Sequence, residues 1–308
     1  MLKKIKQPKA SIIIVNYNGE KFLPDLLNSL KKTRYPNYEI IVVDNISTDN
    51  SVKIIKKNFP KVKIIENKIN NGFAGGANDG IRASKGEYVV ILNYDMYVHP
   101  DWLSHLIETM QSDKKIAVVG YSRLLPKSDI IETLGNKSIN INLAKFKKIG
   151  AGHNLKEYPD EELIEVDFCL GLMRMSVLKK VGTFDEKTFA MYEEADICRR
   201  IKDEGYGIVI NPKSKVWHFG SQSIKKTSAF RIYYSYRNRL RYVLKHNHEF
   251  AKIYYASILI LIYFYKILKF SFKGKFDLSW AILKGIGWNI KNLRDYLAWA
   301  KEKQVAIG

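Results

Sequence analysis

One ten-residue stretch, residues 86–95, places the strongest constraint on what this chain can fold into. Its β-branched and aromatic residues from Tyr88 to Leu92 predict a buried strand, which gives way to Asn93 and Asp95. In open α/β sheets, ligands bind beyond the carboxyl ends of the strands. A carboxylate there is well placed to hold a hard cation, and the cation to hold a diphosphate. The alternative is a strand that ends in an ordinary turn rich in Asn and Asp.

Apolar runs of the same kind alternate with helical patterns along the first two thirds of the chain. The order strand, helix, strand, helix, strand predicts an α/β fold with a doubly wound, mostly parallel sheet. Strands are expected over residues 10–15, 38–43, 62–65, 116–120, 166–174 and 207–210, the last ended by Pro212. Helices are expected over residues 22–30, 50–58, 102–110 and 176–182, and from residue 193 onward. Residues 124–163 show no clear period and are expected to form loops and short strands around a cleft.

A glycine-rich segment, residues 70–80, is expected to form a turn that leads into a helix ending near Gly86. Glycines let backbone N–H groups approach a phosphate, and the helix N-terminus adds a favourable dipole. The spacing of these glycines matches neither the dinucleotide fingerprint nor the triphosphate-binding loop. A tight connection between a strand and a helix is therefore the simpler interpretation.

Two further features carry candidate chemistry. Glu193, Glu194 and Asp196 lie in the first turn of a predicted helix. They either complement the helix dipole or supply a general base at a cleft. His218 follows a predicted strand, and a lone histidine is more often structural than functional. It becomes a metal-ligand candidate only if it lies near Asp95.

The net charge of +20 favours a polyanionic partner, such as nucleic acid, an anionic membrane surface or a phosphorylated substrate. The charge is concentrated at the C-terminus, where residues 225–308 hold 17 Lys and Arg against 4 Asp and Glu. This shift in composition predicts a domain of residues 1–224 and a basic, apolar helical region of residues 225–308. The two cysteines lack metal-ligand spacing, and the N-terminus shows no signal-peptide pattern, so we expect a cytosolic protein or one on the cytosolic face of the membrane.

The C-terminal region contains an apolar run over residues 253–265, which is shorter than the roughly 20 residues of a spanning helix. Lys266 and Lys269 interrupt the pattern, which suits a helix lying in the membrane interface. A buried core helix is the alternative, and a homodimer contact is another use for the same region. A second interfacial helix is predicted from aromatic residues interleaved with lysines, namely Trp280, Trp288, Tyr296 and Trp299.

Taken together, the motifs of residues 11–241 resemble the inverting nucleotide-sugar glycosyltransferases of family 2, which have the GT-A fold, and in particular their rhamnosyltransferase-like branch. That branch extends lipid-linked or cell-surface glycans. The matching motifs occur in the family's order. They are Val15-Asn16-Tyr17-Asn18, Val43-Asp44-Asn45 with Ser47 and Asp49, Asn71-Gly72-Phe73-Ala74 with Asn78 and Gly80, Leu92-Asn93-Tyr94-Asp95, Glu193-Glu194-Ala195-Asp196, and His218 with Gly220.

The resemblance implies a role for each matching position. Asn16 and Tyr17 would line the nucleotide pocket, Asp44 would accept the N–H of the base, and Asp49 would shape that pocket. The segment from Asn71 through Gly72 to Asn78, together with Asn93, would face the ribose and the diphosphate. Asp95 would bind a divalent cation, Mg²⁺ or Mn²⁺, with His218 as a second ligand. Glu194 matches the catalytic base, with Glu193 and Asp196 as alternatives, and Arg237 and Asn238 are candidates for contacts to the acceptor or a phosphate.

Two departures from the family pattern bear on this reading. Asn93 stands where the metal motif often begins with Asp, which lowers the negative charge of the site. Glu193-Glu194 replaces the usual Glu-Asp, so either carboxylate could reach the acceptor.

The implied reaction moves a sugar from a UDP or dTDP donor to a hydroxyl of a glycan or polyprenyl-diphosphate-linked acceptor at the cytoplasmic face of the membrane. A nucleotidyltransferase acting on sugar phosphates and a nucleic-acid-binding protein are the alternatives. Against the nucleic-acid alternative, the basic excess accompanies an apolar, tyrosine-rich run rather than a known recognition module.

Overall fold

The computed structural model describes residues 7–158, 162–220 and 228–296. The chain divides into two compact units. The sheet unit comprises residues 1–137, 148–189 and 193–220, and the helical unit comprises residues 138–147, 190–192 and 221–308. The boundary predicted between residues 224 and 225 lies outside the described residues.

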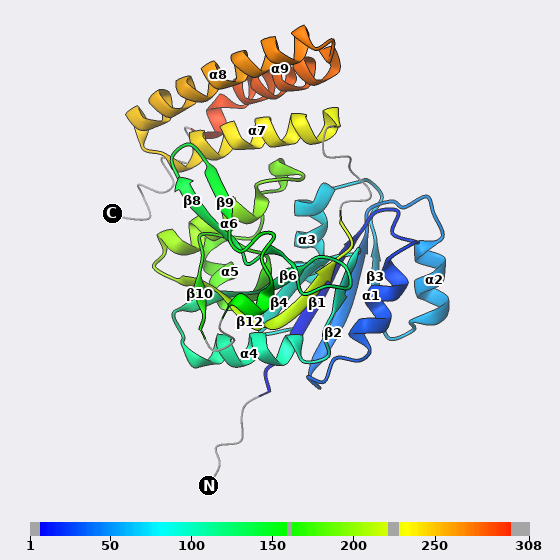
Figure 1. Cartoon of the computed structure of the whole chain (residues 1–308). Helices are drawn as coiled ribbons and strands as arrows, with labels where there is room; N and C mark the ends of the chain where they lie inside the picture. The colour runs from blue at the N-terminus through cyan, green and yellow to red at the C-terminus, as the bar shows by residue number, and fades with distance from the viewer. Residues whose placement is uncertain (1–6, 159–161, 221–227, 297–308) are drawn as a thin grey trace. The chain divides into compact units, whose positions relative to one another are not determined.

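Within the described part of the sheet unit, the strands form a ten-stranded mixed sheet in the order β10-β12-β6-β11-β4-β1-β2-β3, with β5 beside β12 and β7 beside β6 (Figure 1). Strands β1 to β4 run parallel to one another, and β12 runs parallel to β6. Strand β11 is antiparallel to both of its neighbours. The bounds are β1 (Ala10–Asn16), β2 (Tyr38–Asp44), β3 (Lys63–Glu66), β4 (Tyr88–Asn93), β5 (Met96–Val98), β6 (Ile116–Leu124), β7 (Ile131–Thr133), β10 (Ile164–Glu165), β11 (Gly171–Arg174) and β12 (Gly207–His218). A separate ladder joins β8 (Asn136–Asn140) and β9 (Lys145–Lys148).

Helices cover both faces of the sheet because successive side chains of a strand point to opposite faces. Ile12 and Ile14 of β1 pack in one core, and Ile13 packs in the other. The first core includes α1 (Leu23–Leu30), α2 (Ser51–Asn58) and α4 (Trp102–Ser112). The second includes α3 (Gly72–Ala83), α5 (Met175–Val181) and α6 (Glu193–Asp203). Two 3₁₀ turns, η1 (Leu155–Glu157) and η2 (Glu186–Thr188), complete the regular structure of this unit. The predicted doubly wound, mostly parallel sheet is confirmed.

The glycine-rich segment differs from its prediction, because most of it lies inside helix α3 rather than in a turn before it. Its glycines allow the helix to approach the sheet closely. A methyl group at Gly80 would overlap Cγ2 of Ile13, and one at Gly76 would lie 2.9 Å from Cγ1 of Val15. These two glycines therefore serve helix–sheet packing, which a short glycine motif does not distinguish from phosphate binding.

Two strands also depart from their predicted bounds. Strand β12 continues through Pro212 to His218, because a register shift between Asn211 and Lys215 accommodates the proline. The strand expected over residues 166–174 is limited to Gly171–Arg174. The continuation of β12 matters for the site because it carries His218 to the far end of the sheet.

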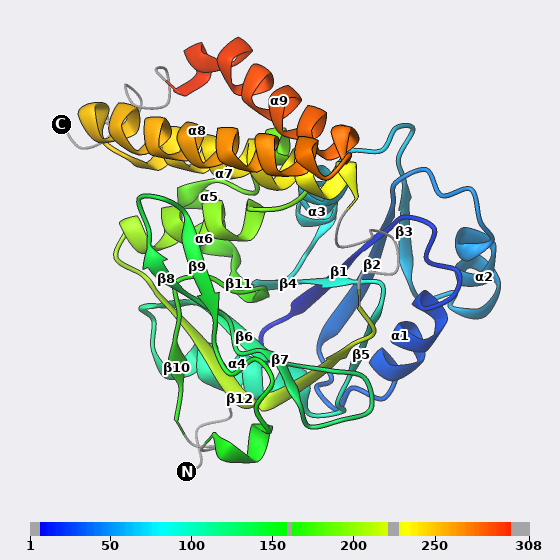
Figure 2. The same cartoon turned by 45° about the horizontal axis from the view of Figure 1, so that its top comes forward.

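The described part of the helical unit contains α7 (Ala229–His246), α8 (Glu249–Phe272) and α9 (Phe276–Lys291), which lie alongside one another (Figure 2). Helix α8 is longer than the predicted run, because Lys266 and Lys269 continue the helix instead of interrupting it. Within the described residues, one helix, Phe250–Phe272, is long and apolar enough to cross a membrane, judged by length and composition alone. Of the residues predicted for the second interfacial helix, Tyr296 is buried and Trp299 lies outside the described residues.

Candidate active site

The carboxyl ends of β1, β2 and β4 lie together at one edge of the sheet. The strand register pairs Asn16 with Asp44, and Val15 with Asn93. The strand order also reverses at β1, because β2 and β3 lie on one side of it and β4 on the other. Such a switch point is where open α/β sheets bind ligands. The sheet thus brings together three of the predicted donor-binding residues.

Asp44 is buried and is held in place by its neighbours. Its Oδ1 accepts hydrogen bonds from Asn16 Nδ2 at 2.7 Å and from Ser47 Oγ at 2.6 Å. Its Oδ2 accepts one from the Ser47 backbone N–H at 2.9 Å. An ionised carboxylate offers about four acceptor sites, so Oδ2 still has room for a further donor. The geometry is that of an oriented carboxylate at a strand end.

The loops after β1 and β2 are tied together next to Asp44. Asp49 accepts hydrogen bonds from the backbone N–H groups of Glu20 at 2.8 Å and Ser51 at 3.0 Å. Its carboxylate therefore shapes the loops. Tyr17 directly follows β1 and is 43% exposed, which leaves its ring available to a ligand.

The pairing of β5 with β12 brings Asp95 and His218 together. His218 pairs with Met96, and the Phe219 backbone N–H donates to the Asp95 carbonyl oxygen at 2.9 Å. As a result, Nε2 of His218 lies 3.4 Å from Oδ1 of Asp95, and both side chains are buried. His218 therefore meets the condition on which its candidacy as a ligand depends.

Glu132 is a member of this site that the sequence did not reveal. It lies on β7 in the stretch without a clear period, and its Oε2 is 2.7 Å from Nδ1 of His218. Arg123 Nε lies 3.2 Å from the same oxygen, and Lys148 Nζ lies 3.2 Å from Oε1. Burial alone would raise the pKa of Glu132, but the hydrogen bond to His218 and the positive charges of Arg123 and Lys148 lower it to about 2. Glu132 is therefore a carboxylate that orients the imidazole.

His218 lies between two carboxylates. Burial alone would lower the pKa of His218, but its hydrogen bonds to Asp95 and Glu132 raise it to about 9. A carboxylate that holds one ring nitrogen while the other faces the binding position is the usual outer support of a metal-ligating histidine.

The side chains of Asp95 and His218 fit a divalent cation that also binds a nucleotide diphosphate. Among the described residues, no group of three or more His, Cys, Asp and Glu side chains is arranged to hold a metal ion on its own. Mg²⁺ in nucleotide sites is typically held by only one or two carboxylates, and phosphate oxygens and waters complete its shell. One carboxylate with an oriented imidazole is consistent with that incomplete set.

Glu193 and Glu194 begin helix α6. Glu193 is buried, and its Oε2 has no hydrogen-bond partner among the described residues. Burial raises the pKa of Glu193, and the neighbouring charge of Glu194 raises it further. Burial also raises the pKa of Glu194, although the charges of Arg123 and Lys148 act in the opposite direction. A carboxylate with a raised pKa is suited to take up a proton near neutral pH.

Asp196, the third alternative for the base, is committed elsewhere. Its Oδ2 pairs with Arg200 Nη2 at 3.0 Å, and both side chains are buried. The guanidinium of Arg200 also donates to the carbonyl oxygens of residues 181–183. Asp196 therefore takes part in a buried structural ion pair, and its candidacy as the base stays a prediction.

Glu194 lines a small pocket in the sheet unit. Arg123 lines the same pocket and links it to the chain of contacts through Glu132 and His218 to Asp95. The two candidate centres, the predicted cation position and the predicted base, thus lie in one connected region. Glu193 does not line this pocket. The other lining residues are Tyr121, Thr133, Gly135, Asn136, Cys169 and Leu170.

The segment just before α6 has an unusual backbone. Phe189, Met191 and Tyr192 have φ values of 61°, 71° and 70°, a region that side-chain-bearing residues rarely adopt. Such residues cost about 1–3 kcal/mol each and persist only where the surroundings hold them. Within the helical unit, Asn238 Nδ2 donates to the carbonyl oxygens of Ala190 at 2.7 Å and Met191 at 2.8 Å.

Arg237 and Asn238, the candidates for contacts to the acceptor or a phosphate, both have partners inside the protein, and their predicted role stays a prediction. Asn238 is buried and anchors residues 190–192. Arg237 is also buried, with its guanidinium 4.5 Å from the ring centres of both Tyr234 and Trp288. Both side chains hold the helical unit together.

Asn78, a predicted donor-binding residue, also has partners inside the protein. Its Nδ2 donates to the Phe184 carbonyl oxygen at 2.8 Å, and its Oδ1 accepts from the Phe184 backbone N–H at 3.0 Å. The amide of Asn78 thus forms a buried link to Phe184, and its donor-binding role stays a prediction. Asn71 and Gly72 lie at the start of α3, where Asn71 Nδ2 donates to the carboxylate of Asp79. Gly72 has a φ of 68°, and a methyl group built on it would overlap the carbonyl oxygen of Phe189.

Solved structures with the same fold define the structural class. GalNAc-T7, in a structure with UDP, GalNAc and Mn²⁺, has a TM-score of 0.61 and 18% identity, covering 77% of this chain and 48% of that one. The mannosyltransferase PcManGT from Pyrobaculum calidifontis, in complex with GDP-Man and Mn²⁺, has a TM-score of 0.58 and 15% identity, covering 98% and 88%. At these identities the likeness shows the fold alone, and that fold is GT-A.

Residues 11–182 match the sequence profile described as glycosyl transferase family 2, and the chain belongs to that family. It is 28% identical over 221 residues to the poly-beta-1,6-N-acetyl-D-glucosamine synthase of Staphylococcus epidermidis, covering 70% of this chain but only 50% of that protein. It is 29% identical over 286 residues to the low-salt glycan biosynthesis hexosyltransferase Agl10 of Haloferax volcanii, covering 87% and 86%.

Proposed function

We propose that this protein is an inverting glycosyltransferase that moves a sugar from a nucleotide-diphosphate donor to a hydroxyl of a glycan or lipid-linked acceptor. One observation carries the proposal beyond family membership. Asp95 and Glu194, which are far apart in sequence, are joined in space through His218, Glu132 and Arg123. This arrangement supports a donor diphosphate and an acceptor hydroxyl meeting at the same place.

In the proposed reaction, Glu194 accepts the proton of the acceptor hydroxyl as its oxygen bonds to the anomeric carbon. The bond from that carbon to the diphosphate oxygen breaks in the same step, so the configuration inverts. Asp95 and His218 would hold a divalent cation, which when bound supplies charge stabilisation for the leaving diphosphate. Glu132 keeps the imidazole of His218 oriented, and Arg123 contributes positive charge beside Glu194.

The donor side is proposed to use the edge formed by β1, β2 and β4. The oriented carboxylate of Asp44, supported by Asn16 and bordered by Tyr17, is suited to accept an N–H of the nucleotide base. Asp49 fixes the loops around it, and Asn71, Gly72 and Asn93 are proposed to approach the ribose and diphosphate. These assignments rest on the geometry of the strand ends and on the family motif. The amide of Asn93, in place of a carboxylate, leaves the proposed cation site with less negative charge.

The sugar and the acceptor are proposed more broadly. The names of the relatives include N-acetylglucosamine and hexose transfer, and one from Methanococcus voltae, 26% identical, is named for a dolichyl-phosphate-linked acceptor. A UDP or dTDP sugar and a polyprenyl-diphosphate-linked or glycan acceptor fit this range. Membership of the rhamnosyltransferase-like branch stays a prediction. Comparing the turnover of dTDP-rhamnose with that of UDP-hexoses would test it.

We also propose that the helical unit attaches the protein to the cytoplasmic face of the membrane. The side chains of α8 include exposed apolar residues along its length, such as Phe250 at 91%, Leu261 at 70% and Phe272 at 88%. Removal of residues 253–308 is expected to release the protein from anionic liposomes in flotation. A full-length chain that stays in solution with liposomes present, and forms a dimer through this region, would support the homodimer alternative.

Product analysis separates the proposed activity from its main alternative. Incubation with a labelled nucleotide sugar and an acceptor should release a nucleoside diphosphate in step with glycoside formation. Release of pyrophosphate from a nucleoside triphosphate and a sugar phosphate would instead identify a nucleotidyltransferase. Salt-dependent DNA binding in the absence of either reaction would support the nucleic-acid alternative.

A further inference from the structure

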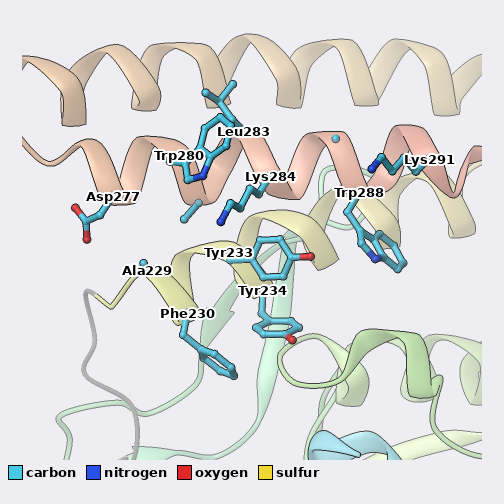
Figure 3. A pocket seen from close by; sticks show the side chains of 12 residues that line it. Ala229, Phe230, Tyr233, Tyr234, Asp277, Trp280, Leu283, Lys284, Trp288 and Lys291 are labelled. Carbon is cyan, nitrogen blue, oxygen red and sulfur yellow. The ribbon is translucent and has the colours of Figure 1, made fainter.

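An open groove lies within the helical unit, between α7 and α9. Its volume is about 840 Å³, which is within the range of small-molecule sites. Its walls are mostly apolar and aromatic; α7 contributes Phe230, Tyr233 and Tyr234, and α9 contributes Trp280 and Trp288 (Figure 3).

The charges at the groove are arranged along α9. Lys284 and Lys291 line it, and the Nζ of Lys284 lies 5.6 Å from the ring centre of Trp280. No ion pair to either lysine is found among the described residues, and both side chains are exposed. Asp277 lines the groove beyond Trp280, at the end away from Lys291 (Figure 3). The groove therefore has an apolar wall and two ammonium groups available to an anion.

Gly287 marks the open floor of the groove. A methyl group built on it would meet no atom within 4 Å, although Gly287 lies inside helix α9. By contrast, a methyl group on Gly285 of the same helix would lie 3.2 Å from the Arg237 backbone nitrogen. Glycine in a helix interior costs about 1 kcal/mol relative to alanine. Packing between helices accounts for Gly285, whereas the space over Gly287 is free for a ligand.

We propose that this groove binds an anionic membrane phospholipid, with an acyl chain against the aromatic wall and the phosphate between Lys284 and Lys291. Two observations select this occupant. The amphiphilic character of the groove matches a molecule with one apolar and one anionic end, and the same unit carries the exposed apolar face of α8. An anionic phospholipid is abundant at the surface where α8 is proposed to lie, so the inference rests on the membrane attachment proposed above.

The test uses the full-length chain, vesicles and tryptophan fluorescence, with no nucleotide sugar present. Bromine on an acyl chain quenches tryptophan at short range. Trp280 and Trp288 line the groove, so the part of the quenching that the groove variants below remove reports what occupies it. Two vesicle preparations of phosphatidylcholine and phosphatidylglycerol are compared, with the bromine on phosphatidylcholine in one and on phosphatidylglycerol in the other, at equal bromine density. Both are used at lipid concentrations at which flotation shows that all of the protein is bound. We expect brominated phosphatidylglycerol to quench at least 3-fold more than brominated phosphatidylcholine.

Two variants locate the effect. Gly287→Leu fills the groove, and Lys284→Gln with Lys291→Gln removes its cations; each should bring the quenching ratio close to one while flotation persists. Lys273→Gln with Lys275→Gln is the matched control, because it removes the same charge from exposed positions outside the groove and should keep the ratio.

Three results would overturn the inference. A wild-type ratio near one would show general immersion without a site, and an unchanged ratio in Gly287→Leu would place the lipid elsewhere. Displacement of the brominated phospholipid by equimolar polyprenyl phosphate would identify a carrier lipid as the occupant. Loss of flotation by the wild type would instead count against the membrane attachment itself.

Discussion

Removing the carboxylate of Glu132 should weaken the response to a divalent cation without touching either proposed ligand. Glu132 Oε2 lies 2.7 Å from Nδ1 of His218, so Glu132→Ala leaves the imidazole free to rotate away from Asp95. Loss of such an outer support typically costs about 10- to 100-fold in metal affinity. That range corresponds to roughly 1.4–2.7 kcal/mol, at about 1.4 kcal/mol per tenfold.

The assay is turnover of a nucleotide sugar as a function of Mn²⁺ or Mg²⁺ concentration. Glu132→Ala should shift the half-saturating cation concentration upward by that factor and should recover much of its turnover when the cation is in excess. Unfolding supplies a second readout, because Arg123 loses the carboxylate that lies 3.2 Å from its Nε. Leaving that group without its partner should lower the free energy of unfolding by about 1–3 kcal/mol.

Glu66→Ala is the matched control. Glu66 also forms an ion pair, with Lys56 at 2.7 Å, but both side chains are more than half exposed. An exposed pair of this kind contributes about 0–1 kcal/mol, and Glu66→Ala should not change the cation response. A Glu132→Ala enzyme with wild-type cation dependence would refute the role assigned to Glu132.

Three further predictions follow from particular contacts. Burial raises the pKa of Glu193, so its ionisation opposes folding as the pH rises above the ordinary pKa of a carboxyl group. Glu193→Gln should therefore stabilise the protein by about 1–3 kcal/mol at pH 8 and by much less at pH 4.5. Thermal unfolding at the two pH values measures the difference. Equal effects at both pH values would contradict a raised pKa. Asn238→Ala should lower kcat by about 10- to 100-fold with little change in the KM for the donor. The reason is that residues 190–192, which precede the proposed base, lose the hydrogen bonds from Asn238. A change in KM alone would show that these hydrogen bonds are not needed for positioning. Gly80→Ala should destabilise the chain by about 1–3 kcal/mol, because its methyl group would overlap Ile13 of the sheet. Gly287→Ala, where space is free, should stabilise the chain by up to about 1 kcal/mol. Denaturant unfolding of the two variants tests this, and equal shifts in the free energy of unfolding would argue against close packing at α3.

The sheet and its polar edge were predictable because they depend on local patterns. The buried runs that became β1, β2 and β4 are long and β-branched, and Asn16, Asp44 and Asn93 sit where each run ends. Parallel strands align their carboxyl ends, so sequence position alone implied that these side chains meet. The family motifs then placed Asp95, His218 and Glu194 in the same region.

The contacts that connect these residues were not predictable, because they depend on pairing between distant segments. Glu132 lies on the three-residue strand β7, and no period in the sequence marks it. His218 reaches Asp95 only because β12 passes Pro212 through a register shift. The hydrogen bonds of Asn78 and Asn238 to backbone segments far away in sequence could not be predicted either.

The helical unit shows the same limit for apolar patterns. Lys266 and Lys269 interrupted the predicted run, but a lysine can extend its ammonium group away from an apolar helix surface without ending the helix. Helix α8 therefore extends to Phe272. Composition shows the basic charge of residues 225–308, whereas the groove between α7 and α9 depends on how the helices pack.

Single-turnover kinetics of Glu194→Gln, compared with Glu193→Gln, tests the central claim most directly. If Glu194 takes the acceptor proton at the place where Asp95 helps hold the donor, Glu194→Gln should lower the rate of sugar transfer by about 10²- to 10⁴-fold while binding the nucleotide sugar as wild type does. Glu193→Gln should retain most of the rate. Near wild-type transfer by Glu194→Gln, with the large loss in Glu193→Gln instead, would contradict the account.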